Sequence, residues 1–284
     1  MNGIFNIYKE AGMTSHDVVN KLRKILKTKA VGHTGTLDPN ATGVLVVAVG
    51  RGTKVIEYME KDEKTYRAEL TLGITTDTED IWGEVLESKD LREFDLSNKK
   101  IEEVLKSFVG VNNQVPPMYS ALKINGKKLY TLAREGIEVE RAPRQIEIFN
   151  IYDIEINKEK VSFTVHCSKG TYIRTLCKDI GEKLVCGATM SKLERIKAGN
   201  LDIKNSVKLS DLEIEPDKYL INLENVLDKF PIIYLEGEEA KKYLNGIKLS
   251  INKEDGKYRI YIENTLYGVA KIEAGTLKSE KKIS

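Results

Sequence analysis

Cysteine and histidine are scarce in this sequence, with three residues of each among 284. Cys167, Cys177 and Cys186 are too few and too widely spaced for a disulfide framework or a Cys-x-x-Cys zinc site. The three scattered histidines do not complete a set of metal ligands. We therefore expect neither disulfide bonds nor a metal site, and we interpret the cysteines as small core residues.

Long hydrophobic runs and an excess of one charge are also missing. No apolar run approaches membrane-spanning length, and the N-terminus has no basic patch followed by an apolar core, so we expect a cytoplasmic protein without membrane contact. Lys and Arg total 45 against 43 Asp and Glu, a net charge of +2, which gives no global attraction to nucleic acid. Any RNA-binding face must come from local segregation of charge, as in residues 21–29, which carry five basic side chains and no acidic one.

The chain does have the composition of a globular protein, with 41% apolar residues and enough length for one large domain and one small one. Predicted strands dominate its centre, and helices stand beside hairpins without regular βαβ alternation. The fold class is therefore α+β with a mixed, mainly antiparallel sheet. Composition changes at Pro231, after which short strands predict a compact β-rich module. We predict two domains, 1–230 and 231–284.

The most informative stretch is a polar loop that runs directly into an apolar strand, G-H-T-G-T-L-D-P-N-A-T-G-V-L-V-V-A-V-G, residues 32–50. Val44–Val49 lacks polar alternation, which is typical of a strand buried on both faces. Mounted on such a strand, and with glycines and Pro39 shaping its backbone, the loop would hold Asp38 rigidly. Asp-Pro-Asn is equally typical of an ordinary β-turn, so the loop alone leaves both interpretations open.

The loop resembles the catalytic motif of the bacterial tRNA pseudouridine-55 synthases, the TruB family, in which the aspartate is essential. Further segments agree with that family in collinear order between residue 4 and about residue 200. They are K-E-A-G-M-T-S at 9–15, with Glu10 where the family has proline, K-T-Y-R at 64–67, T-D-T-E-D at 76–80, H-C-S-K-G-T-Y-I-R-T at 166–175 and L-E-R-I at 193–196.

The resemblance implies the pseudouridine synthase fold followed by a small PUA-like RNA-binding domain. It also implies an isomerase, an intramolecular transferase that converts the uridine at position 55 in the T-loop of tRNA to pseudouridine. The uridine is flipped out, its glycosidic bond is broken and the base is rejoined through carbon, with no cofactor. Whether the aspartate acts as the nucleophile or removes a sugar proton stays open.

The resemblance also assigns residues to roles. The catalytic residues that it implies are Asp38, Tyr66 and Arg174. In these roles Tyr66 stacks on the base and Arg174 pairs with Asp38. The residues that it implies for substrate binding are Lys9, His33, Lys54, Tyr66, Tyr172 and Leu193, of which His33 lies beside the flipped nucleotide. The helical pattern places Arg174 off the core face, in a first turn where the helix dipole opposes a cation, so we expect a carboxylate or phosphate partner.

The expected partner is the T-arm stem-loop of tRNA, bound by a monomer with no protein partner. A hairpin at Asn125-Gly126, then a short helix, lies in the segment 118–136, which interleaves basic and aromatic residues as suits looped RNA. Two other functions stay open. A nucleotidyltransferase is suggested by His33-Thr34-Gly35-Thr36, half of a His-x-Gly-His loop, although its second histidine is absent. The other is a non-catalytic RNA chaperone.

Overall fold

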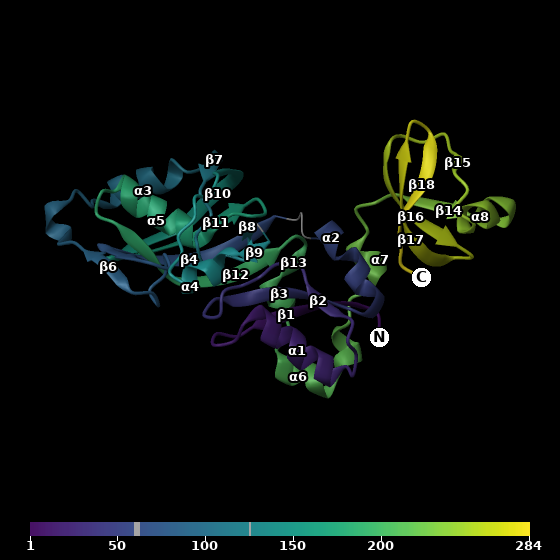
Figure 1. The fold of residues 1–284 in the computed structure, drawn as a ribbon, viewed down its shortest axis with the longest axis horizontal. Coiled ribbons are helices and arrows are strands. Elements are labelled where there is room, and N and C mark those ends of the chain that lie inside the picture. Colours follow the sequence, from purple (N-terminus) through teal and green to yellow (C-terminus); the bar gives the residue numbers. More distant parts are fainter. Residues whose placement is uncertain (60–62, 125) are drawn as a thin grey trace. The chain divides into compact units, whose positions relative to one another are not determined.

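The computed structural model describes residues 1–59, 63–124 and 126–284 (Figure 1). The chain forms two compact units. Unit 1 comprises residues 1–39, 45–61 and 204–284, and unit 2 comprises residues 40–44 and 62–203. Both units contain helices and strands, which agrees with the predicted α+β class.

Unit 1 contains the helix that the sequence predicted after Thr14, α1 (Ser15–Ile25). Asp17 N–H donates to Thr14 Oγ1 at 3.1 Å, and Thr14 N–H donates to Asp17 Oδ2 at 2.8 Å, so the two residues form a capping box. Val18, Val19 and Leu22 bury the apolar face of this helix. The helices and strands of unit 1 before the C-terminal sheet are β1 (Gly3–Lys9), α1 (Ser15–Ile25), β2 (Val31–His33), most of β3 (Thr42–Val49), η1 (Gly50–Val55), α2 (Ile56–Met59), most of η3 (Ile203–Asn205), α6 (Leu209–Ile214), η4 (Pro216–Tyr219) and α7 (Leu223–Val226).

Strand β3 follows the loop that carries Asp38. Val44–Val49 has exposed fractions of 0 to 1%, which confirms that the strand is buried on both faces. Strand β2 pairs with β3 antiparallel, and β1 is the neighbour of β3 on the path of the sheet. The loop between β2 and β3 therefore connects two adjacent hydrogen-bonded strands.

Unit 2 is built on the strand order β12-β4-β11-β10-β7, in which every neighbouring pair is antiparallel. The start of β3 adds one parallel pairing with β12, so the predicted mixed, mainly antiparallel sheet is confirmed. Helices α3 and α5 contact each other, and they pack on β10 and β12 respectively (Figure 1). The elements of unit 2 are β4 (Lys64–Leu72), β5 (Ile74–Thr76), β6 (Val85–Ser88), η2 (Leu91–Glu93), α3 (Asn98–Lys106), β7 (Gly110–Gln114), β8 (Lys123–Ile124), β9 (Lys127–Lys128), α4 (Leu129–Arg134), β10 (Arg144–Asn157), β11 (Lys160–Cys167), α5 (Ile173–Lys183), β12 (Ala188–Ala198) and β13 (Leu201–Asp202).

Strand β12 extends well beyond the L-E-R-I motif, which is the only part of it that the sequence pattern indicated. Lys192, Glu194 and Lys197 interrupt its apolar residues and conceal a strand that pairs with both β4 and β3. Of the predicted hairpin, Asn125 lies outside the described residues, whereas β8, β9 and helix α4 are present on either side of it.

The residues after Pro231 form a sheet with the order β14-β16-β17-β18-β15. Ile260, Ile272 and Leu277 are fully buried in its core. The module also contains helix α8, which begins at Gly237, in a stretch where the sequence predicted short strands. Its elements are β14 (Ile232–Leu235), α8 (Gly237–Leu244), β15 (Leu249–Ser250), β16 (Gly256–Ile262), β17 (Thr265–Glu273) and β18 (Thr276–Lys282).

The three cysteines are free thiols with exposed fractions of 0 to 1%, which confirms their interpretation as core residues. Across residues 1–59, 63–124 and 126–284, no helix combines the length and the apolar character needed to span a membrane. In the same described residues, no group of three or more His, Cys, Asp and Glu side chains is arranged to hold a metal ion.

Candidate active site

The backbone on both sides of Asp38 is held by side chains from β1 and α1. Ser15 Oγ accepts a hydrogen bond from Leu37 N–H at 2.8 Å and lies 3.1 Å from the Leu37 carbonyl, to which it donates. On the other side, the Pro39 carbonyl accepts from Lys9 Nζ at 2.9 Å and from Gly12 N–H at 3.1 Å. The residues before and after the aspartate are thus fixed, which preorganises the loop for chemistry.

Lys9, which the resemblance implies for substrate binding, is the last residue of β1 and is buried. Its exposed fraction is 0%, and its ammonium also donates to the carbonyls of Met13 at 2.7 Å and Glu10 at 3.0 Å. A buried lysine is stable only when its charge is well solvated by protein groups, and these carbonyls provide that. Lys9 therefore stabilises the loop through hydrogen bonds from its buried ammonium group. Glu10, at the family's proline position, is half exposed and forms an ion pair with Lys208 at 3.6 Å.

Two more of the residues predicted to bind substrate belong to unit 1. His33 is the last residue of β2, pairs with Val47 of β3 and is partly exposed. Lys54 lies in η1 and is exposed. Unit 1 thus carries Lys9, His33, Asp38 and Lys54, whereas unit 2 carries the remaining predicted site residues.

Within unit 2, one face of the sheet brings two of the predicted residues together. Tyr66 of β4 is paired with Arg195 of β12, and the neighbouring pair is Ala68 and Leu193. Paired residues, and residues two apart along a strand, share a face of the sheet, so Tyr66, Leu193 and Arg195 lie on the same side. Their exposed fractions are 9%, 8% and 2%. The face combines an aromatic ring, an aliphatic side chain and a buried cation.

Arg195 is a functional candidate that the sequence analysis missed. Its Nε donates to the Val44 carbonyl at 2.7 Å, which ties β12 to the start of β3. Gly43, with φ +99°, pairs with Arg195, and a Cβ on this glycine would lie only 2.3 Å from the Arg195 carbonyl oxygen. Only glycine allows this close approach. A charged residue two positions after Leu193, on the same face of a strand, is the signal that would have identified Arg195.

Tyr172 caps helix α5 and is fixed through its backbone. The Gln114 side chain, buried at the end of β7, donates to the Tyr172 carbonyl at 3.0 Å and accepts from the Tyr172 N–H at 2.8 Å. This pair of bonds holds the residue that precedes Arg174 by two positions. Gln114 could not be identified from the sequence, because a glutamine at a strand end has no distinctive pattern.

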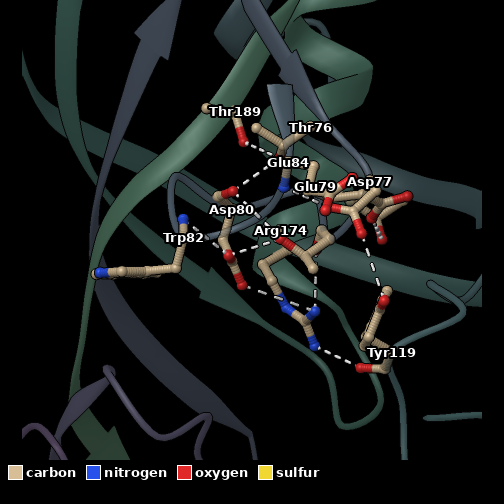
Figure 2. A network of polar contacts seen from close by, with 11 residues as sticks. Thr76, Asp77, Glu79, Asp80, Trp82, Glu84, Tyr119, Arg174 and Thr189 are labelled. Atoms are coloured by element: carbon tan, nitrogen blue, oxygen red, sulfur yellow. Dashed lines mark hydrogen bonds and ion pairs between the residues drawn. The ribbon is translucent and has the colours of Figure 1, made fainter. Parts of the chain in front are cut away.

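Arg174 is buried, with an exposed fraction of 6%, so the prediction that it lies off the core face is wrong. Its burial is possible because its guanidinium donates to the carbonyls of Thr78 at 3.1 Å and Tyr119 at 2.7 Å (Figure 2). Asp80 Oδ2 lies 3.9 Å from Arg174 Nη1. Within unit 2, the carboxylate beside Arg174 is therefore that of Asp80, and the pairing of Arg174 with Asp38 stays a prediction.

The loop that carries Asp80 is held in an unusual backbone conformation. Glu79 has φ +62°, in the left-handed region, where a side chain normally costs about 1 to 2 kcal/mol. Its carboxylate accepts from Thr175 Oγ1 at 2.7 Å and from Lys178 Nζ at 3.4 Å, both on helix α5. The helix that presents Arg174 thus also clamps the residue before Asp80, and this fixes the carboxylate relative to the guanidinium.

Tyr119 joins the basic segment to the same loop. Its hydroxyl donates to Asp77 Oδ2 at 3.3 Å, and Asp77 Oδ1 accepts from Glu84 N–H at 2.7 Å (Figure 2). Burial, followed by the Asp77 charge, raises the pKa of the Tyr119 phenol, which keeps it protonated as a donor. The carbonyl and the hydroxyl of Tyr119 therefore both bind the Arg174 network.

The left-handed conformation at Glu79 leads to a prediction about stability. We expect Glu79→Gly to be more stable than Glu79→Ala by about 1 kcal/mol, because glycine adopts this conformation without strain. Both variants lack the carboxylate, so its lost bonds to Thr175 and Lys178 cancel in the comparison. The free energy of unfolding in urea tests this, and an alanine variant as stable as the glycine variant or more so would contradict it.

Comparison with known proteins places these features in a family. Residues 23–173 match the TruB family pseudouridylate synthase (N terminal domain), and residues 174–230 match the tRNA pseudouridylate synthase B C-terminal domain. The chain is 50% identical over 274 residues to the tRNA pseudouridine synthase B of Clostridium kluyveri, with 94% of each chain covered. It is 47% identical over 291 residues to the protein of the same name in Clostridium perfringens, with 99% of this chain and 98% of the relative covered.

Solved structures confirm the predicted pseudouridine synthase fold. The crystal structure of a Cbf5-Nop10-Gar1 complex contains a chain with a TM-score of 0.74 and 26% identity, covering 99% of this chain and 85% of that one. The fold, the family matches and the collinear motifs agree. The chain therefore belongs to the TruB family of pseudouridylate synthases.

Proposed function

We propose that this protein is a tRNA pseudouridine synthase that isomerises uridine 55 in the T-loop of tRNA. The observation that carries the proposal is the clamped loop of Asp38, in which Ser15 fixes the preceding residue and Lys9 fixes the following one. A loop that only makes a turn does not need both neighbours of its aspartate fixed by buried side chains. Family membership and the tRNA substrate named for its relatives support the same assignment.

The reaction breaks the bond from C1′ to N1 of uridine and forms a bond from C1′ to C5 of the same uracil. Nothing enters or leaves permanently, so no cofactor is required. Asp38 serves as the nucleophile or as the base that removes a sugar proton. As the new bond is completed, C5 loses its proton and N1, which has lost its bond to C1′, takes up a proton, so the uracil is isomerised without net gain or loss. Arg174 acts as the cationic partner of Asp38, held ready by the carbonyls of Thr78 and Tyr119.

The uracil must stay in place while it is detached from the sugar. Tyr66 stacks on it, and Leu193, on the same sheet face, supplies the apolar wall of the pocket. Tyr172, fixed through Gln114, contacts the substrate from the start of α5. A uridine stacked in folded tRNA must first be flipped out, at a cost of about a few kcal/mol, and His33 lies beside the flipped nucleotide and stabilises the opened loop.

The remaining parts bind the RNA. Lys54 is exposed and contacts a phosphate, whereas Lys9 positions the loop and does not touch RNA. We assign residues 231–284, which contain the five-stranded C-terminal sheet, to a PUA-like domain that extends the RNA-binding surface. The enzyme acts as a monomer on the T-arm stem-loop, without a protein partner, in the cytoplasm where tRNA is matured.

The deciding experiment is incubation with an unmodified tRNA transcript, without nucleotide and in the presence of EDTA, followed by analysis for pseudouridine. We expect one pseudouridine per tRNA at position 55 and none in a transcript with cytidine at that position. A strict requirement for a nucleotide triphosphate would instead favour a nucleotidyltransferase. Tight tRNA binding with improved tRNA folding and no pseudouridine would favour a chaperone.

Ser15 provides a test of the clamp itself. Ser15→Ala leaves the N–H and carbonyl of Leu37 without their side-chain partner, and we expect a loss of stability of about 1 to 3 kcal/mol together with a reduced single-turnover rate at saturating enzyme. Thr14→Ala is the matched control, because it removes the helix cap, worth about 1 kcal/mol, and not a bond to Leu37. Equal single-turnover rates in the two variants would show that Ser15 does not position the loop of Asp38.

Tyr66 distinguishes stacking from proton transfer. If stacking is its main role, Tyr66→Phe retains most activity, whereas Tyr66→Leu loses roughly 5- to 150-fold, the range for one stacked base. Single-turnover rates on the same transcript measure the difference. Equal and complete loss in both variants would assign an essential proton transfer to the hydroxyl.

A further inference from the structure

The only tryptophan of the chain is exposed in the loop of the Arg174 network. Trp82 has an exposed fraction of 51%, and Ile81 beside it has 38%. Tryptophan is usually among the more completely covered side chains, so a half-exposed indole is an informative surface feature. None of the roles proposed above for the reaction uses it.

The backbone under this indole is fixed on both sides. Trp82 N–H donates to Asp80 Oδ1 at 3.2 Å, and Gly83 N–H donates to the Asp80 carbonyl at 3.2 Å. Ile81 N–H donates to the Met190 carbonyl of β12 at 2.8 Å. The exposed ring is therefore presented by an ordered loop, and an ordered aromatic surface binds a flat partner with little loss of conformational entropy.

One carboxylate connects Trp82 to the proposed catalytic arginine. Asp80 uses Oδ1 for Trp82 N–H, while its Oδ2 faces Arg174 Nη1 at 3.9 Å. Figure 2 shows the indole extending away from the guanidinium, so it does not fill the space around Arg174 itself. The backbone that carries the ring is fixed relative to Arg174, and the ring extends from it as a platform for a group next to the reacting one.

The acidic residues of this loop do not oppose an approaching nucleic acid as strongly as their number suggests. The Glu79 carboxylate accepts bonds from Thr175 and Lys178, and the Asp77 carboxylate accepts bonds from Glu84 N–H and the Tyr119 hydroxyl. Asp80 is occupied by Trp82 N–H and lies beside Arg174. The charges of Asp77, Glu79 and Asp80 are directed at protein donors, whereas the Glu84 side chain is exposed. The indole is the apolar, stackable surface of this loop.

We infer that Trp82 stacks on an unpaired base of the tRNA loop adjacent to the flipped uridine. The inference rests on the proposed function and adds to it a second nucleotide-binding position. RNA is favoured over a protein partner because the platform is tied to Arg174 through Asp80, and because looped RNA is recognised by stacking its splayed bases on aromatic rings.

The test uses the full-length protein and an unmodified tRNA transcript. Because Trp82 is the only tryptophan, its fluorescence reports this position alone, and we expect saturable quenching as tRNA is added. Trp82→Ala should raise the half-saturation concentration for tRNA roughly 5- to 150-fold, the usual effect of losing one base–aromatic stack, with the saturated single-turnover rate within about threefold of the parent. Trp82→Phe should recover part of the affinity.

Leu86→Ala is the matched control, because Leu86 is 69% exposed in β6 of the same hairpin and we assign it no base. An abasic nucleotide placed in turn at each T-loop position identifies the stacked base as the one whose removal makes Trp82→Ala harmless. Unchanged affinity in Trp82→Ala, unchanged fluorescence at saturating tRNA, or a collapse of the saturated rate without loss of binding would overturn the inference.

These failures are distinguishable from failure of the proposed function. If the parent protein makes pseudouridine while Trp82→Ala binds tRNA as the parent does, only the stacking inference is wrong. The exposed indole would then be assigned to contact with a protein partner. If the parent makes no pseudouridine, the proposed function is wrong whatever the variants do. If Trp82→Ala is poorly folded, the fluorescence of the parent and the affinity of Trp82→Phe still decide the question.

Discussion

Asp38→Asn is expected to abolish pseudouridine formation while the protein stays folded and still binds tRNA. The amide has nearly the volume of the carboxylate and keeps most of the turn's hydrogen bonding, but it can neither attack carbon nor remove a sugar proton. We expect the single-turnover rate to fall at least a thousandfold, a difference of about 4 kcal/mol in the barrier. Because Ser15 and Lys9 hold the neighbouring backbone, the loop should keep its shape.

Thermal denaturation and a filter-binding titration with tRNA accompany the rate measurement. Asp255→Asn, at an exposed position of the C-terminal module, is the matched control and should behave like the parent. If the folded Asp38→Asn protein converts uridine at a rate within tenfold of the parent, about 1.4 kcal/mol, then Asp38 is an ordinary turn residue. The proposed mechanism would then be wrong.

Local patterns in the sequence predicted the elements that depend on local chemistry. Helix α1 was predictable because Thr14 supplies a cap and the apolar residues recur at helical spacing. Strand β3 was predictable because its residues are uniformly apolar. Strand β12 was not, because Lys192 and Glu194 break the pattern, and the strand is stabilised by pairing with distant β4 and β3.

The same distinction applies to the candidate site. The loop of Asp38 has its own signature of glycine, proline and polar residues. The burial of Arg174 has no local signature, because the carbonyls that make it possible come from Thr78 and Tyr119, far away in the sequence. The left-handed conformation of Glu79 was equally hidden, because glutamate has no preference for it and helix α5 imposes it through Thr175.

The bonds from Arg174 to the carbonyls of Thr78 and Tyr119 lead to the second prediction with a large expected effect, which concerns Arg174→Lys. The substitution keeps the positive charge but removes the planar guanidinium that donates to two carbonyls at once, and a single ammonium does not reproduce that geometry. With one buried carbonyl left without its donor, we expect a loss of about 1 to 3 kcal/mol in the free energy of unfolding. We also expect the saturated single-turnover rate to fall roughly a hundredfold or more, about 2.7 kcal/mol in the barrier.

The expected decrease in rate has a specific cause. A lysine in this position can face Asp80 or the proposed partner Asp38, but it cannot hold a fixed orientation toward both carboxylates. Arg67→Lys is the matched control, since Arg67 lies exposed on β4 and its replacement keeps the charge as well. Urea denaturation and single-turnover assays on the same preparations separate the two effects. If Arg174→Lys is destabilised but reacts at the parental rate, then Arg174 is a structural residue that holds Tyr119 and the loop of Asp80, and Asp38 must work without it.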